Sequence, residues 1–143
     1  MISNVKIVVV DEDKLVRDFA VDVLEFCVNR EVRSFDSGAQ AWKYINSGET
    51  PHIVISDADL PDMNGFDLLT NMKKNHPDKV CIIMSHQYKN EKRAKELGAD
   101  AFLAKPFYID EVFEIVQRFV VDKQDLTADL HRQPQTDADK LQD

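Results

Sequence analysis

The chain has 143 residues, of which 43% are apolar and 31% are charged, and these proportions are ordinary for one globular domain. Acidic residues outnumber basic residues by 26 to 18, which gives a formal net charge of -8 at pH 7. Phosphate backbones and anionic lipids repel such a chain, so we expect neither direct nucleic-acid binding nor binding to a membrane surface.

The first half of the chain alternates apolar runs with helical patterns. The run VKIVVV over 5–10 shows no alternation, which is typical of a strand that is covered on both faces. Asp13 is the expected N-cap of the helix that follows, and Asp36 or Ser37 is the expected N-cap of the next one. In order, we predict a strand over 5–10, a helix over 13–27, a strand over 31–35, a helix through Ile45 that stops at Gly48, and a strand over 52–56.

The second half continues the same alternation. After Gly65, a helix that ends before Pro77 carries Phe66, Leu69 and Met72 inward. A strand over 80–84, a helix over 88–97, a strand over 101–104 and a final helix over 109–120 follow. Only Ala94 and Leu97 are clearly apolar within 88–97, so we expect that helix to have a shallow hold on the core. The final helix has one full apolar face, made by Ile109, Val112, Phe113, Val116, Phe119 and Val120.

Five strands that alternate with five helices predict an α/β fold with a doubly wound parallel sheet. The composition changes at Gln124, after which five aspartates accompany Arg132 and Lys140. We therefore divide the chain into a domain over 1–123 and an acidic tail over 124–143. Leu126 and Leu130 are expected to prolong the last helix before Pro134, with disorder beyond it.

Cysteine usage and hydropathy predict the compartment. Cys27 and Cys81 each lie inside an apolar pattern, so we interpret them as buried free thiols in a reducing environment. The opening MISNVKIVVV is too short for a signal peptide, and nothing approaches the ~18 apolar residues of a membrane span. We expect a cytoplasmic protein.

Polar side chains follow four of the predicted strands. Asp11 and Glu12 follow the first, Asp57 the third, Ser85 the fourth and Lys105 the fifth. The carboxyl ends of parallel strands share one edge, so these groups are expected to converge there. Clustered carboxylates repel one another, and a hard divalent cation usually offsets this repulsion. Mg²⁺ fits because it binds one or two carboxylates, waters and a phosphoryl oxygen. A nucleophilic carboxylate in such a site is suited to accept a phosphoryl group.

At this point the chain resembles a known family, the response-regulator receiver domains of two-component signalling, in the CheY-like superfamily. The resemblance covers residues 5–122 and rests on motifs in family order. These are the acid pair DE, the pattern D-x-x-L-P-x-x-x-G that begins at Asp57, the hydroxyl residue Ser85, and K-P-F from Lys105. The resemblance implies a flavodoxin-like (βα)5 fold with strand order 2-1-3-4-5 and a cis peptide bond before Pro106.

The resemblance also implies roles for individual residues. Asp57 would take a phosphoryl group from a sensor histidine kinase or phosphotransfer protein, and Lys105 would pair with the phosphoryl oxygens. Ser85 would turn its hydroxyl onto the phosphoryl group, and Phe102 would turn inward with it. The ligands of Mg²⁺ would be Asp11, Glu12, Asp57 and the backbone carbonyl of Asp59.

The protein implied by these roles is a switch that catalyses its own phosphoryl uptake and loss, and is not a turnover enzyme. It would signal to a downstream protein target through contacts of its last two helices and fifth strand. Formation of a homodimer on phosphorylation would also be compatible with these roles. Asp59 and Gln87 lie where the family tunes the lifetime of the phosphoryl group.

Two features depart from the family pattern. His86 stands where receivers mostly have a small residue, and we interpret it as a solvated loop histidine rather than a residue that narrows access to Asp57. The connection from Ser85 to Gly98 is also a residue or two shorter than in many members.

Other functions remain open. The leading hypothesis is a stand-alone switch, and a second hypothesis is a receiver cut from a longer regulator, with 120–133 as the start of a linker helix to an output domain. The D-x-D of Asp57 and Asp59 resembles the nucleophile and acid of haloacid-dehalogenase-like phosphatases, although there it lies on the first strand and Pro61 is replaced by Thr or Val. A flavodoxin-like cofactor binder shares the fold class, but no loop here is rich enough in Gly, Ser and Thr to cradle a phosphate.

Overall fold

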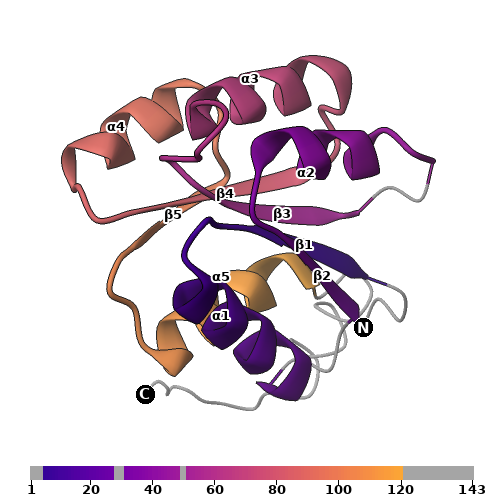
Figure 1. Ribbon diagram of the computed structural model, residues 1–143. Coiled ribbons are helices and arrows are strands. Elements are labelled where there is room, and N and C mark those ends of the chain that lie inside the picture. Colours follow the sequence, from indigo (N-terminus) through magenta and orange to yellow (C-terminus); the bar gives the residue numbers. More distant parts are fainter. Residues whose placement is uncertain (1–4, 28–30, 49–50, 121–143) are drawn as a thin grey trace, which may run out of the picture.

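The computed structural model describes residues 5–27, 31–48 and 51–120. Its centre is a parallel five-stranded sheet in the order β2-β1-β3-β4-β5, as predicted (Figure 1). The strands are β1 (Lys6–Val10), β2 (Glu31–Phe35), β3 (Ile53–Asp57), β4 (Val80–Ser85) and β5 (Ala101–Ala104).

Five helices cover both faces of the sheet. They are α1 (Lys14–Cys27), α2 (Gly38–Ile45), α3 (Gly65–Asn75), α4 (Lys89–Glu96) and α5 (Ile109–Val120). Helices α1 and α5 lie on one face, and α2, α3 and α4 lie on the other (Figure 1). Ile7 and Val9 of β1 belong to the hydrophobic core on the side of α1 and α5. Val8 and Val10 belong to the core on the side of α2, α3 and α4. Because successive side chains of a strand point to opposite faces, the central strand β1 is apolar on both faces from Ile7 to Val10.

Polar side chains cap the starts of α1, α2 and α3. Asp13 Oδ1 accepts hydrogen bonds from the backbone N–H groups of Leu15 (3.0 Å) and Val16 (3.3 Å), as expected of an N-cap. Of the two candidates before α2, Ser37 is the N-cap, and its side chain accepts from the N–H of Gln40 at 3.3 Å. Asn64 caps α3 by accepting from the N–H of Phe66 at 2.7 Å.

Two central strands run one residue further than the sequence pattern indicated. Asp57 is the last residue of β3 and pairs with Met84, and Ser85 is the last residue of β4 and pairs with Ala104. Their backbones are therefore fixed by the sheet. This register holds both side chains at the same carboxyl edge.

Helix α4 has the shallow hold that its sequence predicted. Ala94 is the one fully buried side chain of the helix. Leu97, the first residue after the end of the helix, is half-buried. The guanidinium of Arg93 lies 4.8 Å from the ring centroid of Phe66, which adds a cation–π contact to α3. Little apolar burial therefore fixes the beginning of this helix.

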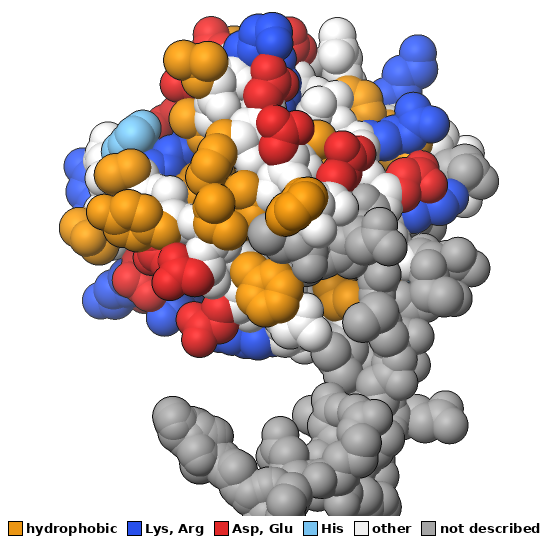
Figure 2. Space-filling model, turned by 90° about the horizontal axis from the view of Figure 1, so that it is seen from below, with side chains coloured by type: hydrophobic (Ala, Val, Ile, Leu, Met, Phe, Trp, Pro, Cys, Tyr) orange, Lys and Arg blue, Asp and Glu red, His pale blue; other side chains and the backbone are white. Residues whose placement is uncertain are grey.

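The apolar face predicted for α5 is only partly buried. Val112, Val116 and Val120 are buried, but Ile109 is 51% exposed and Phe113 is 39% exposed. Ile115 and Phe119 are half-buried against the same core as the valines, whereas the outer part of the apolar face remains at the surface. Figure 2 shows hydrophobic side chains gathered on this side of the molecule, where α1 contributes Leu15 and Phe19.

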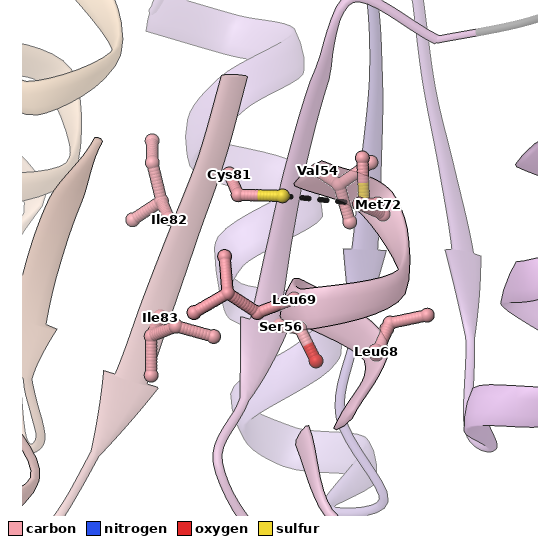
Figure 3. Close-up of a pocket in the computed structure, with 8 residues that line it drawn as sticks. All are labelled: Val54, Ser56, Leu68, Leu69, Met72, Cys81, Ile82 and Ile83. Atoms are coloured by element: carbon pink, nitrogen blue, oxygen red, sulfur yellow. Dashed lines mark hydrogen bonds between the residues drawn. The ribbon is translucent and has the colours of Figure 1, made fainter. Parts of the chain in front are cut away.

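The core between α3, β3 and β4 is tightly packed. Cys81 points toward Met72, with the two sulfur atoms 3.2 Å apart, and the gap between the surrounding side chains is too small to hold a water molecule (Figure 3). Burial raises the pKa of the Cys81 thiol to about 12, so this thiol is protonated and unreactive at neutral pH.

Some expectations lie outside the described residues. These are the burial of the Cys27 side chain and the fate of the acidic tail over 124–143. In the described ranges, no helix is both long enough and apolar enough to cross a membrane.

Candidate functional site

The site is organised around a buried ammonium group. Lys105 Nζ donates to Asp11 Oδ2 at 2.6 Å and to Asp57 Oδ2 at 2.7 Å. Asp11 directly follows β1, Asp57 is the last residue of β3, and Lys105 directly follows β5. The parallel topology therefore brings the three residues to one edge of the sheet. The structure thus unites three of the predicted site residues.

Burial and ion pairing have opposing effects here. Burial raises the pKa of the Asp11 carboxyl, and its hydrogen bond to Lys105 offsets only part of that effect. For Lys105, burial alone would lower the pKa, but the bonds to Asp11 and Asp57 outweigh it and raise the pKa. The lysine therefore carries its charge at neutral pH. One positive charge then serves two carboxylates, so the site keeps a negative surplus.

The loop after β3 orients Asp57. The backbone N–H of Asp59 donates to Asp57 Oδ1 at 3.1 Å, so each carboxylate oxygen has one partner. The N–H of Gly65 donates to the carbonyl of Ala58 at 2.8 Å, and Asp59 pairs with Asn64 in an isolated bridge. A Cβ at position 65 would overlap the carbonyl oxygen of Asp57, so glycine is needed for this close approach.

The loop after β1 separates the two acids of the DE pair. Asp11 is 1% exposed and its Oδ1 accepts from the N–H of Asp13 at 2.9 Å, whereas Glu12 is exposed. Arg17 Nη1 donates to the carbonyl oxygens of Asp11 (2.7 Å) and Glu12 (3.3 Å). Sequence reasoning missed this anchoring role of Arg17, since nothing in its spacing distinguishes it from a surface arginine.

Ser85 is buried, and its hydroxyl oxygen is already engaged. Oγ accepts from the backbone N–H of Gln87 at 3.0 Å and from Asn90 Nδ2 at 2.9 Å. Asn90 was also missed from the sequence, where it is simply an uncharged polar residue near the start of a charged helix. Phe102 lies on β5 beside Ile83 and is half-buried against the core on the α3 and α4 face.

The predicted magnesium ligands are only partly assembled. Among the residues that the structure describes, no group of three Asp, Glu, His or Cys side chains is gathered to hold a metal ion. Asp11 and Asp57 are joined through Lys105, and Glu12 stands apart in solvent. The donor chemistry nevertheless fits Mg²⁺, because the ligands are carboxylate oxygens and the site retains negative charge next to an exposed third acid.

An open pocket of about 220 Å³ lies beside Lys105. Its other lining residues are Leu15, Val16, Phe19, His86, Pro106 and Phe107. The peptide bond between Lys105 and Pro106 is cis. His86 is exposed and borders this pocket, so it stands at the rim of the site.

These groups are arranged for one kind of chemistry. Asp57 offers a carboxylate at the end of a central strand, Lys105 offers a charged donor, and Ser85 offers a hydroxyl one strand away. A carboxylate nucleophile beside a fixed cation is suited to group transfer that needs positioning and charge neutralisation.

Comparison with known proteins agrees with this geometry. The family model described as "Response regulator receiver domain" matches residues 7–117. The DNA-binding transcriptional regulator NtrC of Azospirillum brasilense is 33% identical over 118 residues, which are 81% of this chain and 24% of that protein. The probable chemotaxis protein CheY of Rhizobium etli is 32% identical over 114 residues, which are 77% of this chain and 88% of that protein.

A solved structure with a similar fold is the receiver domain of NtrX from Brucella abortus. It superposes with a TM-score of 0.74 at 28% sequence identity, covering 80% of this chain and 97% of that one. The chain thus spans nearly the full length of single receiver domains, and about a quarter of the length of the NtrC relatives that it matches.

Proposed function

The chain belongs to the response regulator receiver domain family, and we propose that it is a phosphorylation-controlled switch whose acceptor is Asp57. The observation that carries this proposal is the Asp57 carboxylate, held by the N–H of Asp59 on one oxygen and by Lys105 on the other. Its exposed fraction is 14%, against 1% for Asp11, so Asp57 is the more accessible of the two carboxylates.

The proposed reaction is phosphoryl transfer from a phosphohistidine. One oxygen of Asp57 attacks phosphorus, a P–O bond forms, and the bond between phosphorus and the donor imidazole nitrogen breaks, so the imidazole leaves with the electron pair. Lys105 donates to a phosphoryl oxygen and compensates its charge. Positioning and charge neutralisation supply the catalysis, and no turnover of an external substrate is involved.

Asp11, Glu12, Asp57 and the carbonyl of Asp59 would hold Mg²⁺. When bound, Mg²⁺ would neutralise the carboxylates and the incoming phosphoryl oxygens. The surplus negative charge around Lys105 supports this assignment. Exposed Glu12 would turn toward the cation to complete the set.

The proposed donor is a sensor histidine kinase or a phosphotransfer protein, and it would approach over the apolar surface of α1. Leu15 is 82% exposed there and lines the same pocket as Lys105 and His86. Exposed apolar residues that border a reactive site are suited to a protein partner. The downstream target is proposed to be a protein that contacts α4, β5 and α5.

Incubation with acetyl phosphate and Mg²⁺, followed by intact-mass measurement, tests the function. We expect one phosphoryl group on the wild-type protein and none on the Asp57→Asn variant. Omission of Mg²⁺ should prevent uptake. Uptake by Asp57→Asn equal to that of wild type would exclude Asp57 as the acceptor.

A further inference from the structure

We propose that Asn90 is a positioning residue that holds the Ser85 hydroxyl in the arrangement of the unphosphorylated protein. It would thereby couple the occupancy of the phosphoryl site to the first turn of α4. This inference rests on the proposed function, because it concerns how the protein responds when Asp57 is modified. Its basis is the hydrogen bond of 2.9 Å from Asn90 Nδ2 to Ser85 Oγ.

The Ser85 hydroxyl can form only a few hydrogen bonds, so the bond from Asn90 limits which further partners it can take. A serine hydroxyl accepts two hydrogen bonds and donates one. Both acceptor positions are used here, by the N–H of Gln87 at 3.0 Å and by Asn90. Only the hydroxyl proton remains for a new partner such as a phosphoryl oxygen.

Ser85 cannot turn without disturbing these bonds. The Oγ atom moves between staggered positions about one bond, and the strand backbone that carries it is fixed in the sheet. Turning Oγ toward a group on Asp57 therefore takes it away from its two donors. Gln87 belongs to the loop after β4, but Asn90 belongs to α4, so this helix loses a contact when Ser85 turns.

Helix α4 has few other contacts at its beginning. The Tyr88 side chain provides no capping hydrogen bond, and Tyr88 is 79% exposed. The contacts that hold α4 to the core, through Ala94 and through Arg93 on Phe66, lie further along the helix. Backbone hydrogen bonds also join this turn to the loop, from the N–H of Asn90 to the carbonyl of Gln87 and from the N–H of Glu91 to the carbonyl of Tyr88, both at 3.0 Å. The Asn90 side chain adds a direct bond from the start of α4 to Ser85, and its loss should loosen that turn.

The test is the affinity of Mg²⁺-loaded protein for beryllofluoride, used as a phosphoryl mimic. If the Asn90 contact stabilises the unmodified arrangement, Asn90→Ala raises the apparent affinity, because less of that stability has to be overcome. One hydrogen bond corresponds to a gain of roughly two- to tenfold. Asn75→Ala removes an equivalent amide from the exposed end of α3, and should stay within about twofold of wild type.

A double mutant identifies the route. In a Ser85→Ala background the acceptor is gone, so adding Asn90→Ala should change the affinity by less than about twofold. Hydrogen exchange provides a second readout that needs no mimic. Amides in the first turn of α4 should exchange faster in Asn90→Ala than in wild type or Asn75→Ala, while thermal melting confirms that each variant is folded.

The outcomes are separable. If wild-type protein does not bind beryllofluoride, the acceptor assignment of Asp57 fails, and the role of Asn90 fails with it. If wild type binds but Asn90→Ala gains no affinity, only the inference about Asn90 is overturned. An equal gain in the Ser85→Ala background, or unchanged exchange in α4, would overturn it too.

Discussion

Lys105 and Asp11, 94 residues apart in the sequence, form a buried ion pair of 2.6 Å. Only 3% of the lysine side chain and 1% of the aspartate side chain are exposed. Asp57 shares the same ammonium group at 2.7 Å. One ammonium group, that of Lys105, therefore joins the carboxylates of Asp11 and Asp57. We expect both the stability and the chemistry of the site to depend on this single positive charge.

Lys105→Met should destabilise the protein strongly. The substitution leaves the buried carboxylate of Asp11 without a counter-charge and beside a second carboxylate, a change that typically costs roughly 3–5 kcal/mol. Urea denaturation would measure the loss of unfolding free energy. Asp57→Asn is the matched control, since it leaves Lys105 with Asp11 alone and relieves repulsion, and its midpoint should equal or exceed that of wild type. A stable Lys105→Met would show that the pair contributes little.

Asp62 should make stability depend on pH. Its carboxylate accepts from the N–H groups of Gly38 and Ala39, both at 2.8 Å, at the start of α2. The bonds from Ala39 and Gly38 lower the pKa of Asp62 below its usual 3.8. The stabilisation is thus complete above the pKa of the unfolded chain, and is lost as the pH falls through the lower pKa of the folded state.

Asp62→Asn should therefore lower the urea midpoint at pH 7, and its difference from wild type should shrink below about pH 4. Asp36→Asn, which changes an exposed acid just before α2, controls for the loss of one charge. A difference that is constant across the pH range would contradict the role given to the Asp62 carboxylate.

Gly65→Ala should damage both stability and the site. The added Cβ would overlap the carbonyl oxygen of Asp57 and lie 2.8 Å from Ala58 Cα, and neither backbone atom can move away freely. Overpacking of this kind costs roughly 1–3 kcal/mol. In Gly38→Ala the new Cβ meets the flexible end of Met63, so the loss measured by thermal or urea denaturation should be smaller. Equal losses would mean that the close approach to Asp57 is not the limiting contact.

Glu12→Gln should weaken Mg²⁺ binding without changing the stability of the metal-free protein. Glu12 is exposed and separate from the Lys105 cluster, so folding does not depend on its charge. Even neighbours of metal ligands cost roughly tenfold or more in affinity when they are changed, so loss of a ligand carboxylate should cost at least that. Calorimetric titration with Mg²⁺ measures it, and an unchanged affinity would remove Glu12 from the proposed ligands.

The fold and the grouping of polar residues at one edge of the sheet were predictable because their signals are local. Continuous apolar runs such as 5–10 report burial on both faces, and a polar residue at the end of each run is placed at one edge by parallel topology alone. Asp57, Ser85 and Lys105 needed no knowledge of loop geometry to be brought together.

Other features depend on loop conformations and on the packing of neighbouring side chains. The hydrophobic pattern of the sequence does not contain that information. The outward orientation of Glu12 beside buried Asp11 follows from the conformation of one loop turn. The hydrogen bond from Asn90 to Ser85 depends on the path of the loop between them. The apolar pattern of α5 shows which residues can be buried, but the available surface of α1 and the sheet determines that Ile109 and Phe113 remain partly exposed.

The most direct test of the central claim is to locate the modified residue. The protein is treated with acetyl phosphate and Mg²⁺, then reduced with borohydride, which converts an aspartyl phosphate to homoserine, and digested for peptide mass spectrometry. We predict homoserine at position 57, and at neither Asp11 nor Asp59. Homoserine at another position, or none in protein that has gained phosphoryl mass, would contradict the assignment of Asp57 as the acceptor.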